Sequence, residues 1–263
     1  MSVPATGVID YSGVTETCGN RVTREALSML YTRYAFAAGF SEGRDILEVA
    51  CGGGPGLGYL ARRARHVVGG NYTQRLLAQA SRHYRGQIPL VRLDAHALPF
   101  RSGSVGVVLL YEALYYLSEA ARFIDEAWRV LTRPGCLVIS TVNREWPDFN
   151  PSPFSTRYFS GSELFALLRD RGFQTEIYGA FPVVGDSPNE RVISTIRRAA
   201  VRLHLIPRTM RGKELLKRVF LGRLVAFPAE VAEAMAPYCA PIPLPPNGPI
   251  RGFKALFAVG QRT

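Results

Sequence analysis

Short apolar runs alternate with helix-like stretches between residues 45 and 142. Five runs have the length and apolar content of buried strands, and apolar residues recur at helical spacing between them. The runs are DILEVA (45–50), HVVGGN (66–71), LVRLDA (90–95), VGVVLLYE (105–112) and GCLVISTV (135–142), and the helix-like stretches are GLGYLARRAR (56–65), TQRLLAQASRHY (73–84) and ARFIDEAWRVLTR (121–133). This alternation predicts an α/β fold in which right-handed βαβ units build a parallel sheet with helices on both faces.

The later part of the chain predicts one more helix and two more strands. In YFSGSELFALLRDRGF (158–173), Ser160 can cap a helix, and Glu163 stands where it completes a capping box. FQTEIYGAF (173–181) and GFKALFAVG (252–260) suit strands, and no long crossover helix beside the second could make it parallel. We therefore predict a sheet of seven strands, mostly parallel, with an antiparallel last strand.

The segment between those two strands, residues 186–252, differs from the rest. Its first part has helical periodicity and many basic residues, among them Arg197, Arg198 and Arg202, and its second part is the proline-rich stretch PYCAPIPLPPNGP (237–249). A sixth strand parallel to the others ends at the ligand-binding edge of the sheet, so we predict that the segment forms a basic helical lid over the active site. Arginines of this kind suit the binding of a phosphate, a carboxylate or a membrane surface. The equally favoured alternative is that they only form a basic, solvent-exposed face of the helices.

The expected organisation has three parts. Residues 1–40 form an N-terminal helical cap segment, residues 41–185 and 253–263 form the core, and residues 186–252 form the insertion.

Composition narrows the possible functions. The chain has 263 residues, 47% of them hydrophobic and 20% charged, which suits a folded domain with a full core. Its formal net charge of +11 indicates attraction to an acidic substrate, nucleic acid or membrane surface. The four cysteines lack ligand spacing, which disfavours both a disulfide framework and a metal site. We find no secretory leader pattern, and no apolar stretch approaches the length of ~20 residues that a membrane span needs. We therefore expect a cytoplasmic protein.

The segment DILEVACGGGPGLG (45–58) ends an apolar run in a glycine cluster, which allows a ligand close to the backbone. A phosphate-binding loop would need a Lys-Ser or Lys-Thr pair after its last glycine, and none follows. A dinucleotide fingerprint would need GxGxxG, but Leu57 and Tyr59 stand at the third glycine position in the two registers. Glu48 at the end of the strand, followed by glycines, instead suits a ligand with a cationic amine.

This segment resembles motif I of the class I S-adenosylmethionine-dependent methyltransferases, whose usual form is (D/E)xGxGxG. The downstream order HVVGGNYT, RLDAHALPF and VGVVLLYEALYYL is also similar, and the nearest subgroup is type 11, which acts mainly on small molecules. The resemblance implies a Rossmann-like sheet and S-adenosylmethionine as cofactor. It further implies that Glu48, Gly52 and Gly54 frame the methionine end, Asn71 binds ribose, Tyr72 covers adenine, and Asp94 with the Ala95 backbone reads the adenine edge. The full cofactor set comprises Tyr11, Glu48, Ala50, Gly52, Gly54, Asn71, Tyr72, Asp94, Ala95 and Tyr111.

Two residues depart from the family pattern. Ala50 replaces the first glycine, a mild change provided that its backbone φ is not positive. Asn71 replaces the acidic residue that binds ribose, so neutral hydrogen bonds would take the place of charge-assisted ones.

Catalytic candidates follow the fourth strand of the family pattern. In YEALYYL, Glu112 is the candidate base, and we expect it at helical i,i+4 spacing from Tyr116, with Tyr115 beside them. A carboxylate that only caps or binds cofactor, and tyrosines that only form pocket walls, are the alternatives. Arg21 is a candidate partner of the methionine carboxylate, with an ordinary surface position as the favoured reading.

Three functions are consistent with this pattern. The first is methyl transfer to an O or N atom of a small, bulky or anionic acceptor. The second is RNA methylation, suggested by the charge, although YEALYYL lacks the (D/N/S)PP(Y/F/W) pattern of many exocyclic-amine methyltransferases. The third is an inactive cofactor-binding or scaffold protein, for which Asn71 is the hint. The sequence leaves the oligomeric state open.

Overall fold

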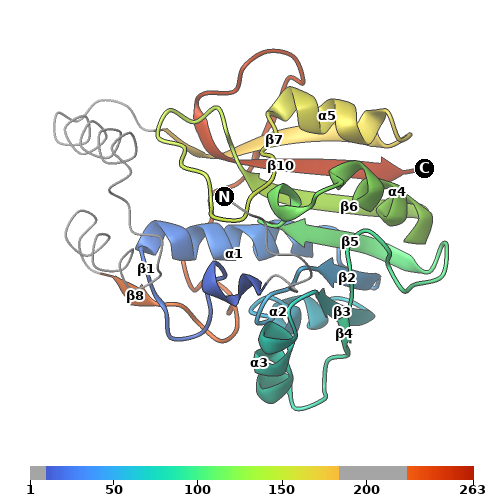
Figure 1. Ribbon diagram of the computed structural model, residues 1–263, viewed down its shortest axis with the longest axis vertical. Coiled ribbons are helices and arrows are strands. Elements are labelled where there is room, and N and C mark those ends of the chain that lie inside the picture. Colours follow the sequence, from blue (N-terminus) through green and yellow to red (C-terminus); the bar gives the residue numbers. More distant parts are fainter. Residues whose placement is uncertain (1–9, 184–223) are drawn as a thin grey trace, which may run out of the picture.

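The computed structural model describes residues 10–183 and 224–263. In this part of the chain the central sheet has eight strands, in the order β4-β3-β2-β5-β6-β10-β7-β9 (Figure 1). The strands are β2 (Asp45–Val49), β3 (His66–Asn71), β4 (Leu90–Arg92), β5 (Val105–Tyr111), β6 (Leu131–Val142), β7 (Gln174–Pro182), β9 (Ile242–Leu244) and β10 (Phe253–Arg262). The first five run parallel, and β10 pairs antiparallel with both β6 and β7, as predicted.

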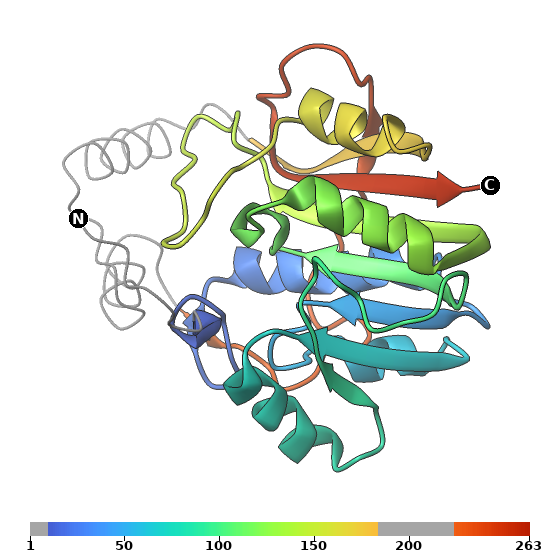
Figure 2. The same cartoon turned by 45° about the vertical axis from the view of Figure 1, so that its right-hand side comes forward.

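Helices cover both faces of the sheet, as Figures 1 and 2 show. The helices are α1 (Arg24–Ala38), α2 (Leu57–Ala61), α3 (Gln74–Tyr84), α4 (Ala120–Val130) and α5 (Gly161–Arg169), with short 3₁₀ turns η1 (Tyr11–Gly13) and η2 (Leu114–Tyr116). Apolar residues of α1, α2 and α3 form one core with the sheet, and those of α4 and α5 form another on its opposite face. The fold is the Rossmann-like α/β architecture that the alternating pattern predicts.

Local sequence explains why these elements form where they do. Every residue of β5 is buried because helices lie on both of its faces, which is why this strand is a continuous apolar run. Helix α4 instead buries Phe123, Ile124 and Ala127 at helical spacing and leaves its other face polar. At the start of α5 the capping box is present, with the Ser160 side chain accepting from the Glu163 backbone and the Glu163 side chain accepting from Ser160.

The sheet has one strand more than the seven predicted. Strand β9 lies within the proline-rich stretch 237–249, for which no strand was predicted, and it pairs antiparallel with the outer side of β7. Pro243 occupies this edge strand, where a missing N–H is tolerated. A separate pair, β1 (Arg21–Val22) with β8 (Val225–Ala226), connects the N-terminal segment to the stretch after residue 223.

Only part of the predicted lid falls in the described residues. Residues 224–252 contain β8 and β9, not helix, whereas Arg197, Arg198 and Arg202 lie outside the described residues. Of the predicted N-terminal cap segment, α1 packs directly on the sheet. The three-part division of the chain remains a prediction. In the described ranges, no helix is both long and apolar enough to cross a bilayer.

Candidate active site

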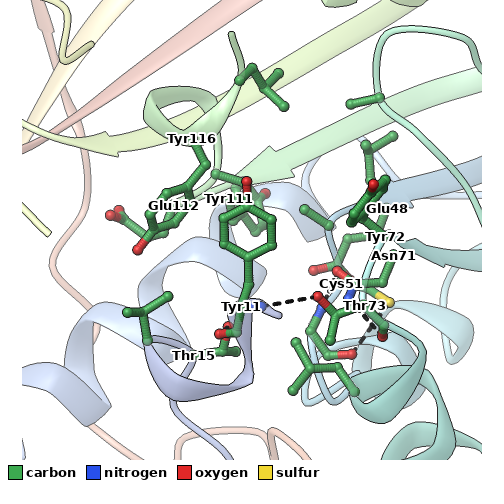
Figure 3. A pocket seen from close by; sticks show the side chains of 18 of the residues that line it. Tyr11, Thr15, Glu48, Cys51, Asn71, Tyr72, Thr73, Tyr111, Glu112 and Tyr116 are labelled. Carbon is green, nitrogen blue, oxygen red and sulfur yellow. Dashed lines mark hydrogen bonds between the residues drawn. The ribbon is translucent and has the colours of Figure 1, made fainter. Parts of the chain in front are cut away.

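A cavity of about 710 Å³ opens where β2, β3 and β5 reach their carboxyl ends. In Figure 3, Glu112 and Tyr116 lie on one side of Tyr11, and Asn71, Tyr72 and Thr73 lie on the other. The structure brings together in its lining twelve residues singled out from the sequence: Tyr11, Glu48, Ala50, Gly52, Asn71, Tyr72, Asp94, Ala95, Tyr111, Glu112, Tyr115 and Tyr116. Gly54 lies behind the lining, where a Cβ would come within 3.0 Å of Leu57 and 3.1 Å of Ala80.

The loop after β2 has left-handed backbone at three positions. Gly52 and Gly54 have φ of +58° and +77°, which glycine adopts without strain. Ala50 has φ of +59°. The condition under which this replacement would be mild is therefore not met, and the alanine methyl group carries the steric cost of the left-handed region.

Glu48, the last residue but one of β2, has a buried side chain, with 2% of its surface exposed. The Tyr34 hydroxyl donates a hydrogen bond to its Oε1 at 2.7 Å, and its Oε2 has no hydrogen-bond partner among the described residues. Burial raises the pKa of Glu48 to about 8. An unpaired buried acceptor on a cavity wall suits an ammonium donor, and the methionine part of S-adenosylmethionine carries one.

Asn71, at the end of β3, connects two loops. Its Oδ1 accepts from the Gly52 N–H at 3.4 Å, and its Nδ2 donates to the Thr73 carbonyl at 3.3 Å. The Thr73 hydroxyl in turn accepts from the Tyr11 N–H at 3.3 Å, which brings η1 to the cavity. The amide of Asn71 can bind both a donor and an acceptor here, which a carboxylate could not do. The binding of ribose by Asn71 stays a prediction.

The expected adenine contacts lie at the same end. Tyr72 is 38% exposed, so its ring is available to a ligand. Asp94 accepts from the His96 N–H at 2.9 Å and contacts His96 Nδ1 at 2.7 Å. Burial alone would raise the pKa of Asp94, but these hydrogen bonds lower it, so the carboxylate is ionised at neutral pH.

Glu112 lies just after β5, and the predicted helical relation to Tyr116 is wrong. Its φ is +50°, its N–H donates to the Ser140 carbonyl at 2.9 Å, and the helical turn η2 begins two residues later. The contact is with Tyr115 instead, whose hydroxyl donates to Glu112 Oε2 at 3.2 Å. Tyr116 pairs its hydroxyl with Ser152 Oγ at 2.6 Å.

The charge of Glu112 depends on two opposing effects. Burial raises its pKa, while the guanidinium of Arg33, with Nη2 at 3.1 Å from Oε1, and the Tyr115 hydroxyl lower it. Burial also raises the pKa of Tyr116 to about 12 and that of Tyr115 well above its usual range. Both phenols therefore stay protonated, and Glu112 is the group at this end that can accept a proton near neutral pH.

Arg33 and Tyr34 of α1 also line the cavity, beside Leu30 of the same helix, and no sequence pattern pointed to them. The Tyr111 hydroxyl donates to the Arg33 carbonyl at 3.1 Å, which fixes this part of the helix against β5. Arg21 is exposed on β1 and is not among the lining residues, so Arg33 is the arginine present in the described lining. No local motif marks either residue of α1, because their role depends on how the helix docks.

Comparison with known proteins places this site in a family. Residues 47–139 match the methyltransferase domain family. A probable S-adenosylmethionine-dependent methyltransferase of Mycolicibacterium smegmatis is 36% identical over 143 residues, 51% of this chain and 53% of that protein. A phthiotriol/phenolphthiotriol dimycocerosates methyltransferase of Mycobacterium ulcerans is 38% identical over 105 residues, 38% of this chain and 37% of that protein. The chain thus spans about half the length of the first relative and less of the second.

Solved structures share the fold at low identity. A Thermotoga maritima protein described as a possible histamine N-methyltransferase superposes with a TM-score of 0.58 at 15% identity, over 91% of this chain and 94% of that one. The cyclase SpnF gives 0.57 at 17% identity, over 94% and 87%. The chain carries a class I S-adenosylmethionine-dependent methyltransferase domain. S-adenosylmethionine is the cofactor that this family and fold imply, and the unpaired Glu48 oxygen and the glycine backbone fit it.

Cofactor binding should release a proton from Glu48. The carboxyl is protonated below its pKa of about 8, and a nearby ammonium favours the carboxylate, so affinity should rise with pH up to about 8 and then level off. Calorimetry in buffers of different ionisation enthalpy measures the proton directly. Glu48→Gln should abolish the release, and Asp94→Asn serves as the control that keeps it. Equal proton release by the parent and by Glu48→Gln would contradict this assignment.

Ala50→Gly should make the protein more stable. Relief of the left-handed strain, about 1–2 kcal/mol, exceeds the added chain entropy of glycine, about 0.4–1 kcal/mol, so the net gain in unfolding free energy should be up to about 1 kcal/mol. Urea unfolding measures it. Ala35→Gly, within α1, is the matched control and should lose about 1 kcal/mol. A loss of stability in Ala50→Gly would show that the methyl group packs more favourably than the backbone is strained.

Proposed function

We propose that this protein transfers a methyl group from S-adenosylmethionine to an O or N atom of a small acceptor, with Glu112 accepting the acceptor's proton. The observation that carries the proposal is the half-buried side chain of Glu112, whose carboxyl lines the cavity beside Arg33 and Tyr115, opposite the cofactor residues across Tyr11. Its raised pKa suits a general base that works near neutral pH.

The proposed reaction needs little from the chain beyond alignment and one proton transfer. The bound cofactor supplies an activated methyl group, whose bond to sulfur breaks as its bond to the acceptor forms. Glu112 takes the proton that leaves the acceptor. The guanidinium of Arg33 favours the ionised form of Glu112 and partly offsets the effect of burial on its pKa, and the Tyr115 hydroxyl donates to the second carboxylate oxygen at 3.2 Å. Alignment of the acceptor for in-line attack comes from the cavity walls.

The described residues favour a neutral or cationic acceptor over an anion. Four acidic residues and one arginine line the cavity as a whole: Glu16, Glu48, Asp94, Glu112 and Arg33. Glu48 and Asp94 belong to the cofactor end, so Glu112 and Glu16, whose charge raises the pKa of Glu112, outnumber Arg33 at the acceptor end. The anionic acceptor expected from the sequence would depend on arginines that lie outside the described residues. One relative is named as a methyltransferase of phthiotriol and phenolphthiotriol dimycocerosates, which supports a small or lipid-like acceptor.

Glu112→Gln should bind S-adenosylmethionine as well as the parent and lose turnover by about 10²–10⁴. Turnover of the parent should climb with pH as the carboxyl ionises, and the variant should lose that dependence. Formation of S-adenosylhomocysteine measures turnover, and calorimetry measures the cofactor. Glu42→Gln, exposed at the opposite end of β2, is the matched control and should behave as the parent.

Three outcomes would contradict parts of this proposal. Unchanged turnover in Glu112→Gln would assign catalysis to alignment alone. Cofactor binding without transfer to any acceptor tested would favour the scaffold alternative. Methylation of RNA, with affinity that falls steeply with salt, would favour the RNA alternative.

A further inference from the structure

An aromatic residue occupies a glycine position in a tight turn at the cavity. Residues 152–155, Ser-Pro-Phe-Ser, form a turn in which the Ser155 N–H donates to the Ser152 carbonyl at 3.3 Å. Proline fixes a negative φ at the second position, and Phe154 at the third position has φ of +67°. This is the pattern of a type II turn, whose third residue is ordinarily glycine or asparagine. A bulky side chain there is a genuine outlier.

Hydrogen bonds from neighbouring elements hold the turn in this conformation. The Ser152 Oγ pairs with the Tyr116 hydroxyl at 2.6 Å, and the Ser152 N–H donates to the Tyr158 hydroxyl at 2.9 Å. Thr156 then donates its N–H to the Tyr115 carbonyl at 2.7 Å. The turn is therefore attached on both sides to the segment that carries Glu112 and the two tyrosines. These contacts hold the strained backbone of Phe154 in place, so its positive φ belongs to an anchored turn.

Burial of the phenylalanine ring does not offset this strain. The residue is 59% exposed, the largest exposed fraction among the exposed large hydrophobic residues of the described chain. Phe154 also lines the cavity, together with the aromatic residues Tyr11 and Tyr116, whose rings lie 5.2 Å apart. A strained backbone that presents an exposed ring to a cavity indicates a ligand contact.

We propose that Phe154 is an acceptor-binding residue that contacts the apolar part of an amphipathic acceptor at the mouth of the cavity. This inference rests on the proposed function, because the hydroxyl or amine of the same molecule would face Glu112. The acceptor class that fits is a hydroxyl or amine attached to an apolar chain or ring system, since the mouth offers aromatic surface and the interior offers a carboxylate.

Stability and binding should respond in opposite directions to the same substitution. Phe154→Gly removes both the strain and the ring, so it should raise Tm by about 2 °C while it weakens the acceptor contact. Phe154→Ala keeps the positive φ and removes only the ring, so Tm should stay unchanged. A residue with a structural role would lose stability in both variants, which would overturn the proposal.

Binding can be measured without the natural acceptor, with para-alkylphenols from methylphenol to hexylphenol as probes. Calorimetry on the protein saturated with S-adenosylhomocysteine should show that each added methylene tightens binding to the parent about threefold to fourfold. Phe154→Gly and Phe154→Ala should reduce this to less than about twofold, and Phe154→Tyr should restore it. Ala234→Gly, which relieves a φ of +52° at an exposed site away from the cavity lining, should raise Tm and leave the chain-length dependence intact.

The outcomes separate this inference from the proposed function. If the parent binds no cofactor, the proposed function fails, and the alkylphenol series on the cofactor-free protein still tests Phe154. If the parent transfers methyl groups but its alkylphenol affinity is independent of chain length, or is unchanged in Phe154→Gly, the role of Phe154 is overturned and the proposed function stands. Absence of alkylphenol binding to the parent likewise overturns the role of Phe154.

Discussion

Two neighbouring residues of α1 contact carboxyl groups at the carboxyl ends of two adjacent strands, β2 and β5. The Tyr34 hydroxyl donates to Glu48 on β2 at 2.7 Å, and the Arg33 guanidinium lies 3.1 Å from Glu112 just beyond β5. This approach depends on Gly56, because a Cβ there would lie 1.8 Å from the Tyr34 ring. A short piece of one helix therefore sets the positions of the acidic groups at both ends of the cavity. A shift of α1 would leave Glu48 without its hydrogen-bond donor and Glu112 without its counter-charge, and both losses are costly away from water.

The parts predicted from the sequence are those encoded by local patterns. Buried parallel strands appear as continuous apolar runs, and surface helices carry apolar residues at helical spacing, so β2 to β6 and α2 to α5 lie where the pattern places them. The edge of the sheet at which the cavity lies was predictable from the strand pattern, whereas the roles of its residues toward the cofactor are what the family resemblance implies. In parallel sheets ligands bind beyond the carboxyl ends of strands, so Glu48, Asn71 and Asp94 had to meet at one edge.

The parts not predicted depend on tertiary contacts. Nothing in its own sequence separates Arg33 from the other arginines, because its role arises only when α1 docks against β5. The left-handed φ of Ala50 and of Glu112 likewise contradicts local propensity, and Glu112 donates its N–H to the Ser140 carbonyl of the neighbouring strand β6. Strand β9 joins the sheet at a proline-rich stretch because an edge strand needs hydrogen bonds on one side only. Ala50, Glu112 and Phe154 are exceptions of this kind that line the cavity, whereas β9 lies at the outer edge of the sheet.

The fold itself leaves the chemistry open, since the same architecture also serves the cyclase SpnF. What distinguishes this site is the arrangement of charge. The chain has a net charge of +11, yet the described lining carries four acidic side chains and one arginine. In the proposed reaction, positive charge leaves the sulfur as the methyl group departs and develops on the acceptor atom. Glu48 is assigned to the ammonium group of the cofactor, whose charge is the same before and after transfer, so it favours cofactor binding without favouring the reaction. A carboxylate at the acceptor end does favour the reaction, because its attraction grows as positive charge develops on the acceptor atom, and that charge is neutralised once the carboxylate accepts the proton. The position of Glu112 opposite the cofactor residues is therefore the feature that, in the proposed function, favours methyl transfer over cofactor binding alone.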